Sequence, residues 1–98
     1  MLYSLTDKLK FDENPRMEIK GVVLTVNADA ETVLRLMEVV NNEGEIGAML
    51  KAMDLLFSDR DKEQLKSLRL SMADFSEVIS TAMSLALGED PDEPRDTE

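Results

Sequence analysis

Three carboxylates have the spacing most able to do chemistry. Asp59, Asp61 and Glu63 stand two residues apart, as the first ligands of a calcium-binding loop do. Such a loop also needs glycine at its sixth position and a bidentate acid at its twelfth, where this chain has Gln64 and Leu70. We therefore expect no calcium site here, but acidic residues in the first turn of a helix, where the helix dipole favours them.

The residue types needed for most catalysis are missing. The chain has no histidine and no cysteine, so the usual triads, dyads and thiolate metal sites cannot be assembled. Lysine or carboxylate bases would need a pocket that shifts their pKa values, and no pattern indicates one. The four glycines stand apart from one another, unlike those of a phosphate-binding loop. We expect a protein that is not an enzyme, with no cofactor and no tightly bound transition metal.

The chain is strongly acidic. Its 98 residues include 21 Asp and Glu against 11 Lys and Arg, a formal charge of −10. Residues 89–98 hold six acids and one base, or −5, which leaves −5 for the first 88 residues. Because neither part is a basic footprint, we expect no binding to nucleic acid or to anionic membranes. With no signal peptide or membrane-spanning stretch in the sequence, a cytoplasmic protein is expected.

The first quarter of the chain has the alternation of β-strands. Apolar and charged residues alternate around Leu9 and again around Met17. Gly21 can adopt the positive φ that a tight turn needs. We predict a short N-terminal antiparallel β-hairpin or meander over about residues 8–26.

The rest of the chain has helical periodicity. From Asn27 onward apolar residues recur every three or four positions, which indicates a bundle of three to four α-helices. Asn27 or Asp29 can cap the first helix, and Gly88 is expected to end the last. Strands followed by helices are typical of an α+β domain, which we place at residues 1–88. Residues 89–98 are then expected to form a flexible, disordered acidic tail.

The second predicted helix carries the strongest apolar stripe. Its members are Ile46, Met49, Leu50, Met53, Leu56 and Phe57. Such a stripe either fills a core or forms one wall of a groove that binds a partner helix. The residues that we select as a candidate partner-binding surface are Met49, Met53, Leu56 and Phe57. The acidic residues around it are Glu45, Asp54 and Asp59. We expect these carboxylates to keep an empty groove soluble and to meet basic residues of the partner.

Burial between copies of the chain is a further use for apolar residues. The leucines beyond one stripe are Leu34, Leu55 and Leu85. They could be buried in a homo-oligomer as readily as in the core of a single chain.

Three segments of the sequence together resemble a known family of proteins. They are the hairpin MEIKGVVLTVN, the helical opening ADAETVLRLMEVV and the stretch LFSDRDKEQLKSLRLSMADFSEVISTAMSLALGED. This series, over about residues 17–90, resembles the small siphophage-type tail assembly chaperones of bacteriophages and prophages. The resemblance implies a protein that binds the helical tape-measure protein and helps to recruit the major tail protein around it. It also implies that ribosomal frameshifting can exchange the short C-terminus for a longer extension.

The alternative to a chaperone is an acidic protein of phage origin that mimics nucleic acid or acts as an inhibitor. A mimic needs carboxylates packed densely on its folded surface. Here half of the net charge lies in residues 89–98, and Lys and Arg are interspersed through the helical part. Binding to an apolar helical peptide would favour the chaperone. Salt-sensitive competition with duplex DNA for a nuclease would favour the mimic.

Overall fold

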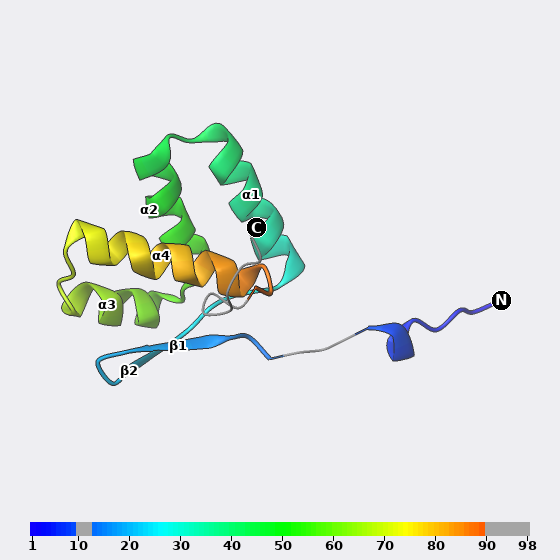
Figure 1. Cartoon of the computed structure of the whole chain (residues 1–98). Helices are drawn as coiled ribbons and strands as arrows, with labels where there is room; N and C mark the ends of the chain where they lie inside the picture. The colour runs from blue at the N-terminus through cyan, green and yellow to red at the C-terminus, as the bar shows by residue number, and fades with distance from the viewer. Residues whose placement is uncertain (10–12, 90–98) are drawn as a thin grey trace, which may run out of the picture.

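A computed structural model shows a β-hairpin followed by four helices (Figure 1). It describes residues 1–9 and 13–89. The elements in chain order are the 3-10 turn η1 (Thr6–Lys8), the strands β1 (Arg16–Ile19) and β2 (Val22–Thr25), and the helices α1 (Ala30–Asn42), α2 (Glu45–Leu56), α3 (Asp59–Ser67) and α4 (Met72–Ala86). The predicted α+β class, with a hairpin before the helices, is confirmed.

The hairpin turns through two residues with positive φ. Lys20 has φ 50° and Gly21 has φ 82°, which is the pattern of a tight two-residue turn whose twist matches that of the flanking strands. The antiparallel pairing sets apolar residues opposite one another, Ile19 with Val22 and Met17 with Leu24. Because side chains alternate along a strand, these four share one face, which packs against the helices.

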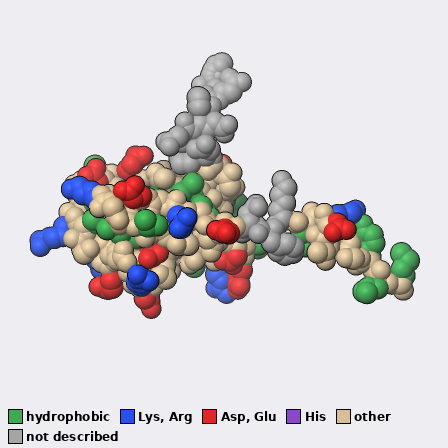
Figure 2. Space-filling model, turned by 90° about the horizontal axis from the view of Figure 1, so that it is seen from below, with side chains coloured by type: hydrophobic (Ala, Val, Ile, Leu, Met, Phe, Trp, Pro, Cys, Tyr) green, Lys and Arg blue, Asp and Glu red, His purple; other side chains and the backbone are tan. Residues whose placement is uncertain are grey.

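The residues before the hairpin form an N-terminal arm, residues 1–9. Lys8 ends η1, so the strand expected around Leu9 is not present in the described residues, and residues 10–12 lie outside them. The arm runs away from the helical body (Figure 1). Its exposed apolar side chains are Met1, Leu2, Tyr3, Leu5 and Leu9, and hydrophobic side chains are visible at its far end in Figure 2.

Three of the four helices begin at a side-chain cap. In the first, the amide of Thr32 donates to Asp29 Oδ2 at 3.3 Å. In the other two, the amide of Asp61 donates to Ser58 Oγ at 3.2 Å and the amide of Asp74 donates to Ser71 Oγ at 3.1 Å. Each bond satisfies an amide that has no partner inside its helix. These caps fix where each of the three helices starts.

Gly88 terminates the last helix, as predicted, two residues beyond its final residue Ala86. Gly88 has φ 83°, and the amide of Glu89 donates a 2.9 Å hydrogen bond to the carbonyl of Ser84. This is the Schellman arrangement, which satisfies carbonyls left open at a helix end. The flexible tail predicted for residues 89–98 lies, beyond Glu89, outside the described residues.

The core lies where the hairpin and the helices meet. Helix α2 is central, because α1, α3 and α4 all pack against it, while α3 also contacts β2. The largest fully buried side chains are Leu24, Val26, Leu36, Leu56, Phe57 and Ile79. Every element of the hairpin–helix body therefore contributes to one core or borders it.

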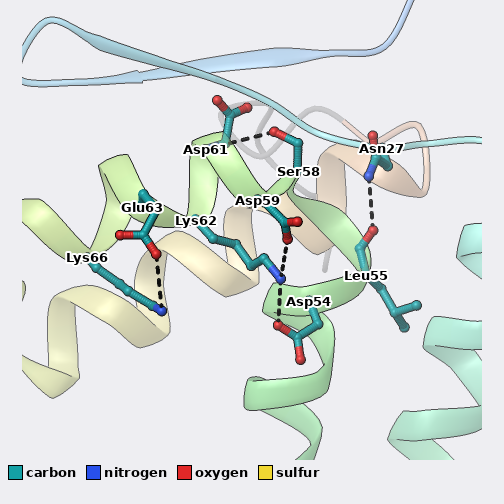
Figure 3. A network of polar contacts seen from close by, with 9 residues as sticks. All are labelled: Asn27, Asp54, Leu55, Ser58, Asp59, Asp61, Lys62, Glu63 and Lys66. Atoms are coloured by element: carbon teal, nitrogen blue, oxygen red, sulfur yellow. Dashed lines mark hydrogen bonds and ion pairs between the residues drawn. The ribbon is translucent and has the colours of Figure 1, made fainter.

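Asn27 fastens the hairpin to the end of α2 (Figure 3). Its backbone amide donates to the carbonyl of Leu56 at 2.8 Å, and its side-chain amide donates to the carbonyl of Leu55 at 3.1 Å. The amide of Thr25 donates to Asp61 Oδ2 in α3 at 2.9 Å. Carbonyls in the last turn of a helix lack intrahelical partners, so these bonds both complete α2 and position the hairpin.

Candidate partner-binding surface

The four residues selected from the sequence separate into two groups. Leu56 and Phe57 are only 0% and 2% exposed and belong to the core. Both side chains are buried inside the body in this structure, so neither is exposed to a partner. Met49 and Met53 are half-buried. Met49 Sδ lies 3.9 Å from the Oγ of Ser76 and so packs on α4.

Met53 borders an open depression of about 350 Å³. The depression lies between α2, the end of α3 and the start of α4. Its other lining residues are Leu65, Lys66, Arg69, Leu70, Met72 and Phe75. Met72 is 57% exposed, whereas Leu65 forms the buried floor at 3%. Apart from its two basic residues, the depression is apolar.

Helix α2 extends this apolar surface beyond the depression. Ile46 and Leu50 precede Met53 by seven and three residues, which places all three on one side of the helix. Ile46 is 65% exposed and Leu50 is 54% exposed. We call this surface the apolar track, made up of Ile46, Leu50, Met53, Leu70, Met72 and Phe75.

The charges at the depression are opposite in sign to those expected from the sequence. Asp54 and Asp59 both pair with Lys62, at 3.0 and 3.1 Å (Figure 3), and neither lines the depression. The hydrogen bond to Asp54, followed by that to Asp59, raises the pKa of Lys62 above its usual value. The charged residues that border the depression are instead Lys66 and Arg69.

These two basic residues were missed because their role depends on the turn after α3. The available signal was the segment LKSLRL, in which two cations alternate with leucines over residues 65–70. The pattern alone does not separate an amphipathic helix end from the rim of a depression. Only the way in which the chain turns between α3 and α4 brings Lys66 and Arg69 next to Met53.

The three carboxylates with calcium-loop spacing do not converge. Their partners are Lys62 for Asp59 (3.1 Å), the Thr25 amide for Asp61 (2.9 Å) and Lys66 for Glu63 (3.6 Å). Each therefore has a separate structural role, two of them visible in Figure 3. Within residues 1–9 and 13–89, no group of three or more acidic side chains is placed to hold a metal ion.

The arrangement offers a surface that suits an apolar segment of a partner. The exposed track supplies apolar contact area, and its methionines can adjust their side chains to a partner. In the described part of the chain, no helix has the length and apolar character needed to cross a membrane. Comparisons of this chain with protein-family models, with curated proteins and with solved structures find no match.

Proposed function

We propose that this protein is a phage-type tail assembly chaperone. In this role it binds an apolar helical segment of the tape-measure protein and assists assembly of the tail tube, without catalysis. The observation that carries the proposal is the exposed apolar track on α2 and at the start of α4. The protein would act in the cytoplasm of the bacterial host, with the major tail protein as a further partner.

The track has the dimensions to accept a helix. From Ile46 to Met53 it follows about two turns of α2, or roughly 10 Å, and the depression extends it past Met72. A partner helix would place apolar anchors at three- and four-residue steps along such a surface. Exposed Leu50 lies midway and would lose most of its contact with water, whereas half-buried Met53 forms the base.

The ion pairs of the body argue against the alternative of a nucleic-acid mimic. Five carboxylates of the described helices and loops form ion pairs, as Glu31–Arg35, Glu43–Lys51, Asp54–Lys62, Asp59–Lys62 and Glu63–Lys66. A mimic of the DNA backbone must present uncompensated negative charges in a regular array. Here nearby cations interrupt the array, so the apolar track supports the chaperone better.

The test is co-purification with segments of the tape-measure protein encoded in the same gene cluster, comparing the wild type with Leu50→Asp. Burial of one leucine contributes about 1.5–3 kcal/mol, so we expect the variant to bind roughly ten- to a hundredfold more weakly. Because Leu50 is 54% exposed, the variant should fold normally, as circular dichroism can verify.

Leu34→Asp is the matched control. Leu34 is an equally helical leucine, 66% exposed on α1 and outside the track, so this variant should bind as the wild type does. Equal binding by Leu50→Asp and the wild type would place the binding surface elsewhere. Failure of every tape-measure segment to bind the wild type would overturn the chaperone function itself.

A further inference from the structure

The turn between α3 and α4 holds an arginine in an unusual backbone conformation. Arg69 has φ 54°, a left-handed conformation that glycine adopts freely and that is unfavourable for other residues. Residues in strained backbone conformations of this kind are concentrated at functional sites. Here the conformation accompanies the end of α3 and leaves Arg69 at the edge of the depression, beside Leu70 and Met72.

Arg69 carries a positive charge at the edge of the depression. It forms no ion pair within residues 1–9 and 13–89. Its neighbour Lys66 reaches Glu63 only at 3.6 Å, between side chains that are 62% and 77% exposed, and exposed pairs of this kind are weak. Lys62, by contrast, is held by two aspartates. In a protein of charge −10, the depression is therefore bordered by two cations, one held by a weak exposed pair and one with no ion pair in residues 1–9 and 13–89.

We infer that the helix bound on the apolar track carries an Asp or Glu beside its apolar face, and that this carboxylate binds the guanidinium of Arg69. This inference rests on the proposed function and specifies the partner's chemistry. A guanidinium matches a carboxylate with two parallel hydrogen bonds, and Lys66 adds a second positive charge next to it.

The same pair of cations sets the direction of the bound helix. The track runs from Ile46, at the start of α2, to the depression at its other end, and only that second end is bordered by Lys66 and Arg69. The net negative charge of the body repels an acidic segment placed elsewhere. A partner with its acidic residue at one end of the apolar face therefore has one favourable orientation.

Two designed 20-residue helical peptides provide the probe. They share one leucine face with three- and four-residue spacing and differ only in two flanking residues at one end, glutamate in the first and lysine in the second. At low salt we expect the wild type to bind the glutamate peptide roughly tenfold more tightly than the lysine peptide. In Arg69→Glu the preference should disappear or reverse, as measured by fluorescence anisotropy.

Two further variants separate charge from folding. Arg69→Gly removes the charge while suiting the left-handed backbone, so it should fold well and still lose the preference. Arg60→Glu makes the same change of charge at an exposed position of α3 that does not line the depression, and it should keep the preference. The inference is overturned if neither peptide binds the wild type, if both bind equally, or if both Arg69 variants keep the preference.

The outcomes for the two proposals are distinct. If Leu50→Asp releases both peptides while the Arg69 variants bind unchanged, the apolar track stands and the inference about the carboxylate fails. If the peptides show the predicted preference and no tape-measure segment binds, the chaperone function fails and the recognition of an acidic helix stands.

Discussion

Leu50 and Leu56 lie on the same helix, yet their surroundings are opposite. Leu50 is 54% exposed, while Leu56 is 0% exposed. The carbonyl of Leu56 also accepts a hydrogen bond from the amide of Asn27. Both belong to one stripe in the sequence, and helical periodicity gives no reason to treat them differently. The difference arises because α1, α3 and α4 pack against only part of the surface of α2.

At the residue scale, Leu56→Ala should destabilise the fold strongly. Truncating a fully buried leucine removes contacts and leaves a cavity, which costs about 2–5 kcal/mol. We expect a loss of about 3 kcal/mol in the free energy of unfolding, measured by urea denaturation. Leu34→Ala, at a side chain 66% exposed, should change it by less than about 0.5 kcal/mol. Similar effects of the two substitutions would contradict the placement of Leu56 in the core.

At the element scale, the helix starts are where the sequence is most informative. Asp29, Ser58 and Ser71 each cap a helix, and Asp and Ser are residue types preferred at helix starts. The cap of α1 also has an electrostatic signature. The hydroxyl of Thr32 donates a 2.7 Å hydrogen bond to Asp29 Oδ1, and this bond, with that from the Thr32 amide, lowers the pKa of Asp29 below its usual value of 3.8.

This lowered pKa predicts how stability changes with pH. A carboxyl group whose pKa is lower in the folded than in the unfolded chain stabilises the fold above the unfolded value, and the contribution is lost as the pH falls through the folded value. Asn also caps helices but does not titrate. The wild type should therefore unfold at a higher temperature than Asp29→Asn above about pH 5, and this advantage should shrink below about pH 3.

Thermal unfolding of both proteins at a series of pH values gives the measurement. The quantity to follow is the difference between the unfolding temperatures of the two proteins. The other carboxylates titrate in both, so their effects on this difference cancel. A difference that stays constant from pH 6 to pH 2.5, or that grows on acidification, would show that the capping carboxylate does not stabilise α1 through its charge.

The helices and strands could be predicted from the sequence more completely than the apolar track could. Alternation around Met17 and the turn at Gly21 indicate the hairpin, and capping residues with apolar spacing indicate the helices, because these signals are local. The surface depends on packing between distant segments. Nothing near Arg69 in the sequence indicates a left-handed residue, since the usual marker is glycine.

At the scale of the whole molecule, the N-terminal arm stands apart from the helical body. None of its apolar side chains belongs to the core. Contacts within the arm are local, such as that of Lys8 Nζ, which lies 5.3 Å from the centre of the Tyr3 ring. Exposed apolar side chains gathered on one projecting segment favour association between molecules.

Deleting residues 2–9 should leave the body intact. We expect a change of less than about 0.5 kcal/mol in the free energy of unfolding, because no core contact is lost. Self-association at high concentration should decrease, as light scattering coupled to size-exclusion chromatography can measure. Replacing Leu2 and Leu5 by serine in the full-length chain should reproduce the decrease. A large loss of stability on deletion would show that the arm packs on the body.

The bonds between the hairpin and the helices have a consequence for synthesis on the ribosome. Thr25 finds its partner Asp61 36 residues later, and the carbonyls that bind Asn27 also follow it in the chain. Because the ribosome adds about 5–20 residues per second, the hairpin is synthesised roughly 2–7 s before α3 is available to bind it. Until α2 and α3 have been translated, the inward face of the hairpin, with Met17, Ile19 and Leu24, lacks part of the helical layer that covers it. The nascent chain is therefore most exposed to misassembly before α3 has been translated.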